Sequence, residues 1–246
     1  MPGTEIIPVV LSKTGAIVNP SDLPTETDLG PIKHLAVAGS RAYGLENETS
    51  DWDFIGFYVK PKRLFLGVQA QHDKTFSWKE PAEIKVHEIG QFLRLLEKSP
   101  YIHESLVQPN YTGPTSDFVL DLQMNHQERL ISSRLVSAYR HLGLGMADKA
   151  EGMEPGPKME KVIRNGYRAL FTAFNLVVWG EFKIKHDREL IYHLASRPKQ
   201  VAIDGLGKTD NTIPKSGFDL RPEPDWAWLN EKLLEYRDYL EEENEY

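Results

Sequence analysis

One stretch constrains this chain more than any other, and it begins where an apolar run over residues 35–38 reaches Gly39-Ser40. The run predicts a buried strand, and a glycine after it lets an anion such as phosphate approach the backbone. If a helix begins there, its first N–H groups point at that anion. Asp51 and Asp53 follow. On a strand they would share one face, and two close carboxylates repel each other unless a cation lies between them. Their hard oxygens suit Mg²⁺, so the stretch predicts a phosphate-binding turn beside a metal site.

The string over residues 39–45, followed by Ser50, Asp51, Asp53 and Gly56, resembles the polymerase-β-like nucleotidyltransferase superfamily. It is similar to the branch of predicted nucleotidyltransferases that includes RNA-ligase-associated, RNA-repair polymerase-β-like proteins. The resemblance implies an α+β fold, in which a small mixed sheet with helices on one face forms a catalytic core. A mainly helical C-terminal domain then closes over the nucleotide. The alternative is a fold-mate that binds nucleotide without chemistry.

A third carboxylate is expected on a later strand. Residues 83–87 alternate polar and apolar side chains, which predicts a strand with Glu83, Lys85 and His87 on one face. The resemblance implies a metal-binding acid on a strand beside the Asp-x-Asp strand, and the matching residue is Glu83. Glutamate stands here where aspartate is commoner, so its longer side chain changes the metal distance rather than the role. The alternative reading of Glu83 is a solvated strand residue.

A long helix expected over residues 158–179 supplies cations. Lys161, Arg164 and Arg168 are spaced at three and four residues, so they share one face. The resemblance places Lys161 and Arg168 over the triphosphate. It also puts Asn165 where the family usually has histidine, a departure that leaves the contribution of that histidine open. The alternative is a basic face that contacts only solvent.

The implied reaction is nucleotidyl transfer, in which a hydroxyl attacks the α-phosphate of an NTP and pyrophosphate leaves. Two Mg²⁺ ions, with Mn²⁺ as a substitute, would activate the hydroxyl and steady the triphosphate. The cations of the long helix would neutralise the leaving pyrophosphate. Arg41 either holds a phosphate or pairs with an acidic neighbour. The residues expected to act are Asp51, Asp53 and Glu83 at the metals, and Gly39, Ser40, Arg41, Lys161 and Arg168 at the nucleotide.

The acceptor hydroxyl is left open by the residues. The resemblance favours an RNA 3′ end, and a protein hydroxyl that receives AMP is the alternative acceptor. A third possibility is a nucleotide-binding regulatory module without catalysis, which would have no need of a metal-bridging triad. RNA contact is expected from basic residues of the helical region, namely Lys158, Lys161, Arg164, Lys183, Lys185 and Arg188.

Composition limits the other function classes. The 246 residues carry a net charge of -7, which argues against broad, sequence-independent coating of nucleic acid. Cysteine is absent, so disulfides and thiolate metal sites are excluded. P-loop and nucleophile-elbow motifs are also missing. No apolar run is long enough to span a bilayer and the N-terminus lacks a signal pattern, so the cytoplasm is the expected compartment.

Three regions are predicted: an N-terminal extension (1–30), a nucleotidyltransferase core (31–112) and a helical C-terminal domain (113–246). Opposite the Asp-x-Asp face, Trp52 and Phe54 are expected to enter the core, with Phe57 as a further candidate. His103 and Glu104 are expected at the surface. A helix over 118–122 is expected to be capped by Asp117, a helix over 128–141 to end at Gly143 and Gly145, and the helix over 158–179 to end at Gly180. Further helices are expected at 89–96, 101–106, 187–194 and after Asp225, which caps the last of them. The other elements expected are an edge strand within 5–11, strands at 32–38 and 52–59, loops at 21–31 and 198–214, and a connector at 147–157.

Overall fold

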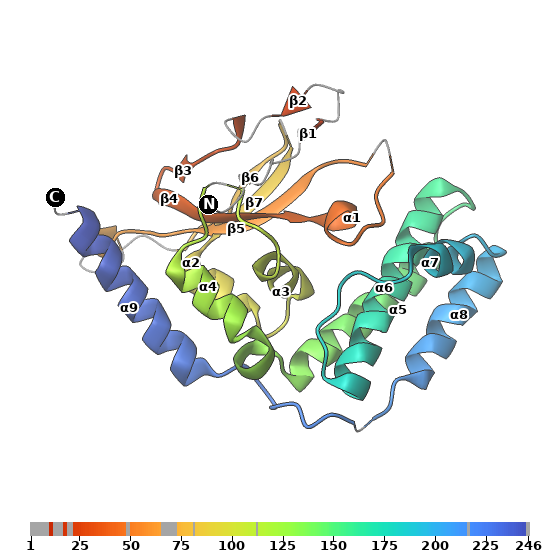
Figure 1. The fold of residues 1–246 in the computed structure, drawn as a ribbon. Coiled ribbons are helices and arrows are strands. Elements are labelled where there is room, and N and C mark those ends of the chain that lie inside the picture. Colours follow the sequence, from red (N-terminus) through yellow and green to blue (C-terminus); the bar gives the residue numbers. More distant parts are fainter. Residues whose placement is uncertain are drawn as a thin grey trace, which may run out of the picture.

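The computed structural model describes residues 10–11, 17–18, 22–47, 50–64, 73–80, 82–111, 113–215 and 217–244 (Figure 1). The strands are β1 (Val10–Leu11), β2 (Ile17–Val18), β3 (Glu26–Thr27), β4 (Gly30–Ala38), β5 (Asp53–Tyr58), β6 (Phe76–Trp78) and β7 (Glu83–Glu88). The helices are α1 (Gly39–Ala42), α2 (Ile89–Leu95), α3 (Pro100–Leu106), α4 (Asp117–Met124), α5 (Ser133–Glu151), α6 (Pro157–Trp179), α7 (Arg188–Ala195), α8 (Lys199–Thr212) and α9 (Trp226–Asn244). Residues 5–9 of the predicted edge strand lie outside the described residues.

The main sheet has the strand order β3-β4-β5-β7-β6. β4 and β5 are antiparallel, whereas β5 and β7 are parallel, so the predicted small mixed sheet is confirmed. In register, Ala38 lies opposite Asp53, and Asp53 lies opposite Glu83. The end of β4 and the beginnings of β5 and β7 therefore meet at one end of the sheet. This end holds the two motifs that the sequence singled out.

One face of the sheet is covered by α2, α3, α4 and α9 (Figure 1). The helices pack on Ile55 and Phe57, which follow Asp53 on the same face of β5 because side chains alternate along a strand. The expectation that Phe57 faces away from Asp53 is therefore wrong, while Trp52 and Phe54 do join the other hydrophobic cluster. Apolar side chains thus continue the face that begins with a carboxylate.

The remaining long helices, α5 to α8, pack against one another on the opposite side of the molecule from α9 (Figure 1). Their core includes Leu135, Ile163, Leu170 and Leu206. The hydrophobic clusters do not follow the predicted boundary near residue 113, because α4 and α9 come after it in the chain yet pack with the sheet. The last helix therefore returns to the sheet instead of extending the helical group.

Two helices of this group differ from the sequence-based expectation. α5 continues to Glu151 through Gly143, which was expected to end a helix, so residues 147–151 of the predicted connector at 147–157 are helical. A Cβ on Gly143 would lie 2.6 Å from Leu170 Cγ, so this glycine permits the close approach of α5 and α6. Residues 199–212, expected as loop, form α8 because Ala202 and Leu206 are buried one turn apart against the other helices.

The connections contain smaller corrections. The predicted loop at 21–31 includes β3 and the start of β4, which form an antiparallel pair. Ser116, rather than Asp117, caps α4, because its hydroxyl accepts from Val119 N. The predicted end of α6 is confirmed, because Gly180 forms its C-cap in a left-handed conformation with a φ of 68°. The predicted beginning of α9 is confirmed too, because the Asp225 side chain accepts a hydrogen bond from Trp228 N. No helix among the described residues is both long and apolar enough to cross a membrane.

Candidate functional site

A cavity of about 620 Å³ lies where the end of β4 meets the beginnings of β5 and β7. Its wall is completed by α2, α3 and α6. The predicted residues that line it are Gly39, Ser40, Asp53, Glu83, Lys161 and Arg168. Asn165, which occupies the position of the family histidine, lines it too. Residues far apart in the sequence therefore converge on one site.

Gly39 begins α1 with a φ of 65°, a left-handed conformation that glycine adopts without strain. A Cβ at this position would lie 2.1 Å from Asp53 Oδ2. The absence of a Cβ at Gly39 therefore makes room for the Asp53 carboxylate. The turn at Gly39-Ser40 and this acid are packed against each other.

We expect Gly39→Ala to displace the Asp53 carboxylate and to lower the transfer activity that the sequence pattern predicts at least about tenfold. Gly44→Ala is a matched control, since Gly44 has a similar φ of 70° but a Cβ added there would have no neighbour within 4 Å. Both variants should lose about 1 kcal/mol of unfolding free energy from backbone strain. Denaturant unfolding and initial transfer rates measure the two effects. Equal activity losses in both variants would show that strain, and not the acid, matters.

Asp53 and Glu83 stand opposite each other at the start of parallel strands, with backbones about 4.8 Å apart. Asp51, in contrast, precedes β5 in the connector and is not among the residues that line the cavity. The sequence pattern predicted that Asp51 and Asp53 share one face of a strand, but β5 begins at Asp53 and does not include Asp51. Within the described residues, no three His, Asp or Glu side chains gather as a preformed metal site. The two facing carboxylates nevertheless match the oxygen ligands that Mg²⁺ takes together with substrate phosphates.

Arg41 does not line the cavity. Its guanidinium donates to the backbone carbonyl of Ser50 at 2.8 Å and lies 4.4 Å from the centre of the Trp52 ring. These two contacts are with a carbonyl and an aromatic ring, and the predicted phosphate contact of Arg41 stays a prediction. Arg41 braces the connector that leads into Asp53.

Helix α6 contributes Lys161, Asn165 and Arg168 to the cavity from successive turns. Arg164 is turned aside, with its guanidinium 4.4 Å from the Tyr192 ring centre and 3.7 Å from Glu160. Two residues of the predicted basic face, Lys161 and Arg168, therefore line the cavity, and Arg164 does not. Lys161 is exposed at the cavity, whereas Arg168 is 1% exposed.

Arg168 belongs to a buried network centred on Glu104. Its guanidinium lies 2.6 Å from Glu104 Oε1 and 3.7 Å above the Tyr43 ring. Tyr139 donates to the same oxygen at 2.7 Å, and Tyr43 donates to Oε2 at 2.6 Å. Four segments are joined here: α3, α5, α6 and the residue that follows α1. The expectation that Glu104 and His103 lie at the surface is wrong, since both are buried.

Charge balance explains why this network is stable in the interior. Burial by itself would lower the pKa of Arg168, but the Glu104 carboxylate and the neighbouring tyrosines raise it above its ordinary value. Burial, followed by the Glu104 charge, raises the pKa of Tyr43 and of Tyr139 well above the usual range. The phenols therefore stay protonated and donate, while Arg168 stays charged.

Further residues complete the cavity beyond the carboxylates, and the sequence pattern assigned them no role. Lys85 and His87 follow Glu83 on β7, while Thr75, Gln91 and Tyr101 come from other elements. The strand alternation had placed Lys85 and His87 on the face of Glu83, so a signal for two of them was present. Thr75 and Tyr101 had none, because only the fold brings them to the site.

A comparison with models of known protein families identifies the family of the chain. The family model described as RNA repair pathway DNA polymerase beta family (RlaP) matches residues 19–165, more than half of the 246-residue chain. The match includes the Gly39-Ser40 turn and the acids at Asp53 and Glu83. A search of curated proteins found no match. The chain therefore belongs to the RNA repair pathway DNA polymerase beta family.

Proposed function

We propose that the protein transfers a nucleoside monophosphate from an NTP to an acceptor hydroxyl. The observation that carries the proposal is the placement of Asp53 and Glu83 in register on neighbouring strands, directly against the turn at Gly39. A phosphate-binding turn beside paired carboxylates serves a reaction at a phosphorus centre. The acceptor oxygen forms a bond to the α-phosphorus while the bond from that phosphorus to the α–β bridging oxygen breaks. Pyrophosphate leaves with the bridging oxygen, and the hydroxyl proton passes to solvent.

Asp53 and Glu83 would hold the divalent cations, with Asp51 of the adjoining connector as the third carboxylate. Bound Mg²⁺ or Mn²⁺ supplies activation of the hydroxyl and charge neutralisation at the phosphates. Gly39 and Ser40 bind the β- and γ-phosphates at the end of β4. Lys161 faces the cavity with an exposed ammonium and neutralises the leaving pyrophosphate, while the buried Arg168 adds positive potential from the wall.

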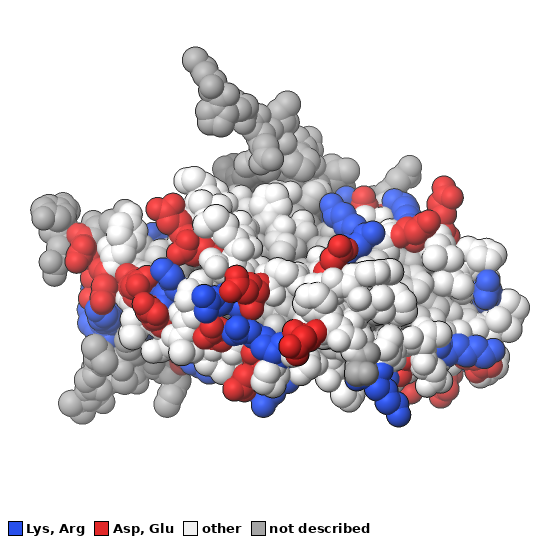
Figure 2. Space-filling view, turned by 60° about the horizontal axis from the view of Figure 1, so that its bottom comes forward, with Lys and Arg blue, Asp and Glu red and all other residues white. Residues whose placement is uncertain are grey.

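The acceptor that we propose is an RNA 3′ end. The description of the family includes an RNA repair pathway, which supports this acceptor. On the face shown in Figure 2, basic and acidic side chains are interspersed, in keeping with the net charge of -7. RNA is therefore bound through a few local contacts, and affinity depends only modestly on salt.

Labelled NTPs test the proposed reaction directly. The protein is incubated with each of the four labelled NTPs and Mg²⁺, with or without an RNA oligonucleotide that ends in a 3′ hydroxyl. Label should appear on the RNA and pyrophosphate should be released. Label on the protein alone supports the AMP-transfer alternative. Binding of NTP without transfer to either acceptor supports the regulatory module.

Glu83 offers a second test of the site. We expect Glu83→Gln to lower turnover about a hundredfold while nucleotide affinity changes less than threefold, because the metal that it holds acts mainly in the transition state. Steady-state rates and equilibrium binding of a fluorescent NTP measure the two quantities. Glu80→Gln, an exposed glutamate outside the cavity, is the matched control. Equal losses in turnover and affinity would make Glu83 a residue that positions the nucleotide.

Glu88 is the other acid of β7, and its contacts assign it a structural role. Its carboxylate accepts from Gly90 N at 2.7 Å, which caps α2, and lies 2.5 Å from Arg237 of α9. Burial, partly offset by Arg237, raises the pKa of Glu88. Glu88→Gln should therefore change stability rather than the metal dependence of transfer.

A further inference from the structure

The strand order decides from which side the acceptor approaches. Nucleotidyl transfer proceeds with the attacking and leaving oxygens in line across the phosphorus. Gly39 and Ser40, at the end of β4, define the triphosphate side, and Arg168 lies on the same side because it covers the ring of Tyr43. In the sheet, β5 follows β4, and β7 and β6 come next. The attacking hydroxyl therefore enters on the side of β7 and β6.

On that side, one cation lies next to the catalytic acids. Lys85 is two residues after Glu83 on the same face of β7, a spacing of about 6.6 Å. Its side chain is exposed, lines the cavity, and makes no hydrogen bond or ion pair within the part of the chain that the structure describes. Ile84 and Val86, on the other face, are fully buried and hold the strand in place. The spacing of Glu83 and Lys85 along β7 is of the order of the distance between the 3′ hydroxyl of a nucleotide and the phosphate of the same nucleotide.

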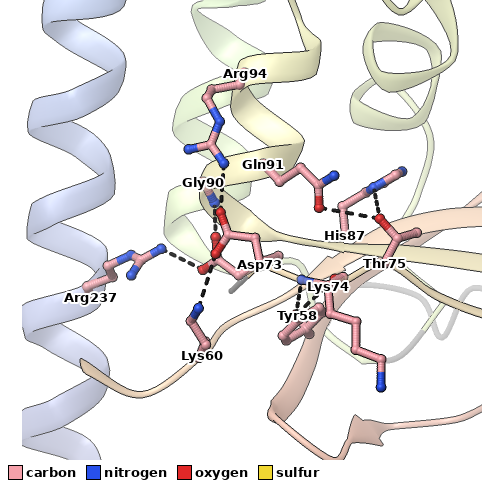
Figure 3. A network of polar contacts seen from close by, with 11 residues as sticks. Tyr58, Lys60, Asp73, Lys74, Thr75, His87, Gly90, Gln91, Arg94 and Arg237 are labelled. Carbon is pink, nitrogen blue, oxygen red and sulfur yellow. Dashed lines mark hydrogen bonds and ion pairs between the residues drawn. The ribbon is translucent and has the colours of Figure 1, made fainter. Parts of the chain in front are cut away.

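A group of uncharged polar side chains lies farther along the same face (Figure 3). The Thr75 hydroxyl is 3.0 Å from His87 Nδ1 and 3.3 Å from Gln91 Oε1. Burial, together with the Lys85 charge, lowers the pKa of His87 to about 4, so the imidazole is neutral at physiological pH. The group offers hydrogen bonds without adding charge, which suits the polar edge of a base or a ribose hydroxyl.

An aromatic ring lines the same cavity from α3, near Glu104 and Arg168. Tyr101, in the first turn of α3, lines it and is 39% exposed. Burial of the hydroxyl and the nearby Glu104 charge raise its pKa, so the phenol is neutral. Exposed aromatic rings in polar channels serve as stacking surfaces for unpaired bases.

We propose that these residues, referred to below as the β7 subsite (Thr75, Lys85, His87, Gln91 and Tyr101), bind the 3′-terminal nucleotide of an RNA strand. Lys85 contacts its phosphate, Tyr101 stacks on its base, and the polar group binds its ribose or base edge. A protein hydroxyl carries no phosphate for Lys85 and no base for Tyr101. The proposal rests on the proposed nucleotidyl transfer and names its acceptor site.

The basic residues near α7, from which the sequence pattern predicted RNA contacts, lie elsewhere. Lys183, Lys185 and Arg188 do not line the cavity. Arg188 donates to the Glu46 carbonyl at 2.8 Å and lies over the Tyr192 ring. Its side chain therefore joins α7 to the connector after α1. The β7 subsite lies beside the reacting atoms, whereas the basic residues near α7 do not.

Direct RNA binding tests the proposal without depending on catalysis. A single-stranded RNA with a 5′ fluorophore and a free 3′ hydroxyl is titrated with the full-length protein at several salt concentrations. Lys85→Ala should weaken binding about tenfold and reduce the slope of log affinity against log salt by about 0.7. Tyr101→Ala should weaken binding about tenfold, and Tyr101→Phe should retain it. Lys79→Ala, an exposed lysine outside the cavity, is the control.

Binding of a fluorescent NTP is measured in parallel and should change less than twofold in Lys85→Ala and Tyr101→Ala. Unchanged RNA affinity and salt slope in Lys85→Ala would overturn the proposal. So would a loss of RNA binding in the triple Ala variant of Lys183, Lys185 and Arg188 but not in Lys85→Ala. Failure of the reaction itself is a separate result, since it appears as absence of labelled product with any acceptor while RNA binding still reports on the β7 subsite.

Discussion

Asp53→Asn should abolish nucleotidyl transfer, with a loss of about a thousandfold or more. Such a loss corresponds to about 4 kcal/mol of transition-state stabilisation. Asp53 lies against Gly39 and opposite Glu83, so its charge lies where the proposed mechanism would hold the triphosphate and the cations. Asparagine keeps the shape of the side chain but supplies a neutral ligand. The transfer rate of labelled NTP, measured across a titration of Mg²⁺ and Mn²⁺, tests the expectation.

The fold should survive this substitution. Removing one of two facing like charges does not lower the unfolding free energy through electrostatics. Asp148→Asn, an exposed aspartate on α5 outside the cavity, should leave rate and stability unchanged. A folded Asp53→Asn protein that transfers NMP at the wild-type rate would refute the proposed mechanism.

Glu104→Ala should cost about 3–5 kcal/mol of unfolding free energy, because it leaves the buried Arg168 guanidinium without its carboxylate. The phenols of Tyr43 and Tyr139 would lose the same acceptor. This is a large part of the total stability of a typical domain, which is about 5–15 kcal/mol. Denaturant unfolding measures the loss. The variant should also need more NTP, since Arg168 forms part of the cavity wall.

A second ion pair on α6 provides a control that shows whether burial of the charge pair causes the stability loss in Glu104→Ala. Glu160→Ala removes the more exposed partner of Arg164 and should cost less than about 1 kcal/mol. Adding Arg168→Met to Glu104→Ala should recover part of the lost stability, because the uncompensated charge is removed. A loss of similar size from Glu104→Ala and Glu160→Ala would mean that the buried charge pair is not the source of the effect.

The sequence by itself predicted the parts of the site that local patterns encode. An apolar run that ends in Gly-Ser predicted β4 and α1, and strict alternation over residues 83–87 predicted β7. Gly180 predicted the end of α6, and Asp225, as an N-cap residue, predicted the beginning of α9. These features depend on neighbours in the chain, whose spacing and backbone preferences are visible without a fold.

The tertiary structure decided what depends on residues distant in the chain. Whether Gly143 ends a helix depends on Leu170 of another helix, which packs against it. Glu104 looks like a surface acid until Arg168 and two tyrosines surround it, because a buried carboxylate is stable only with partners. Asp51 and Asp53 look equivalent in a two-residue pattern, yet β5 begins at the second of them, so only Asp53 lines the cavity. The sheet register, which pairs strands across gaps in sequence, placed Glu83 beside Asp53 and so assembled the site.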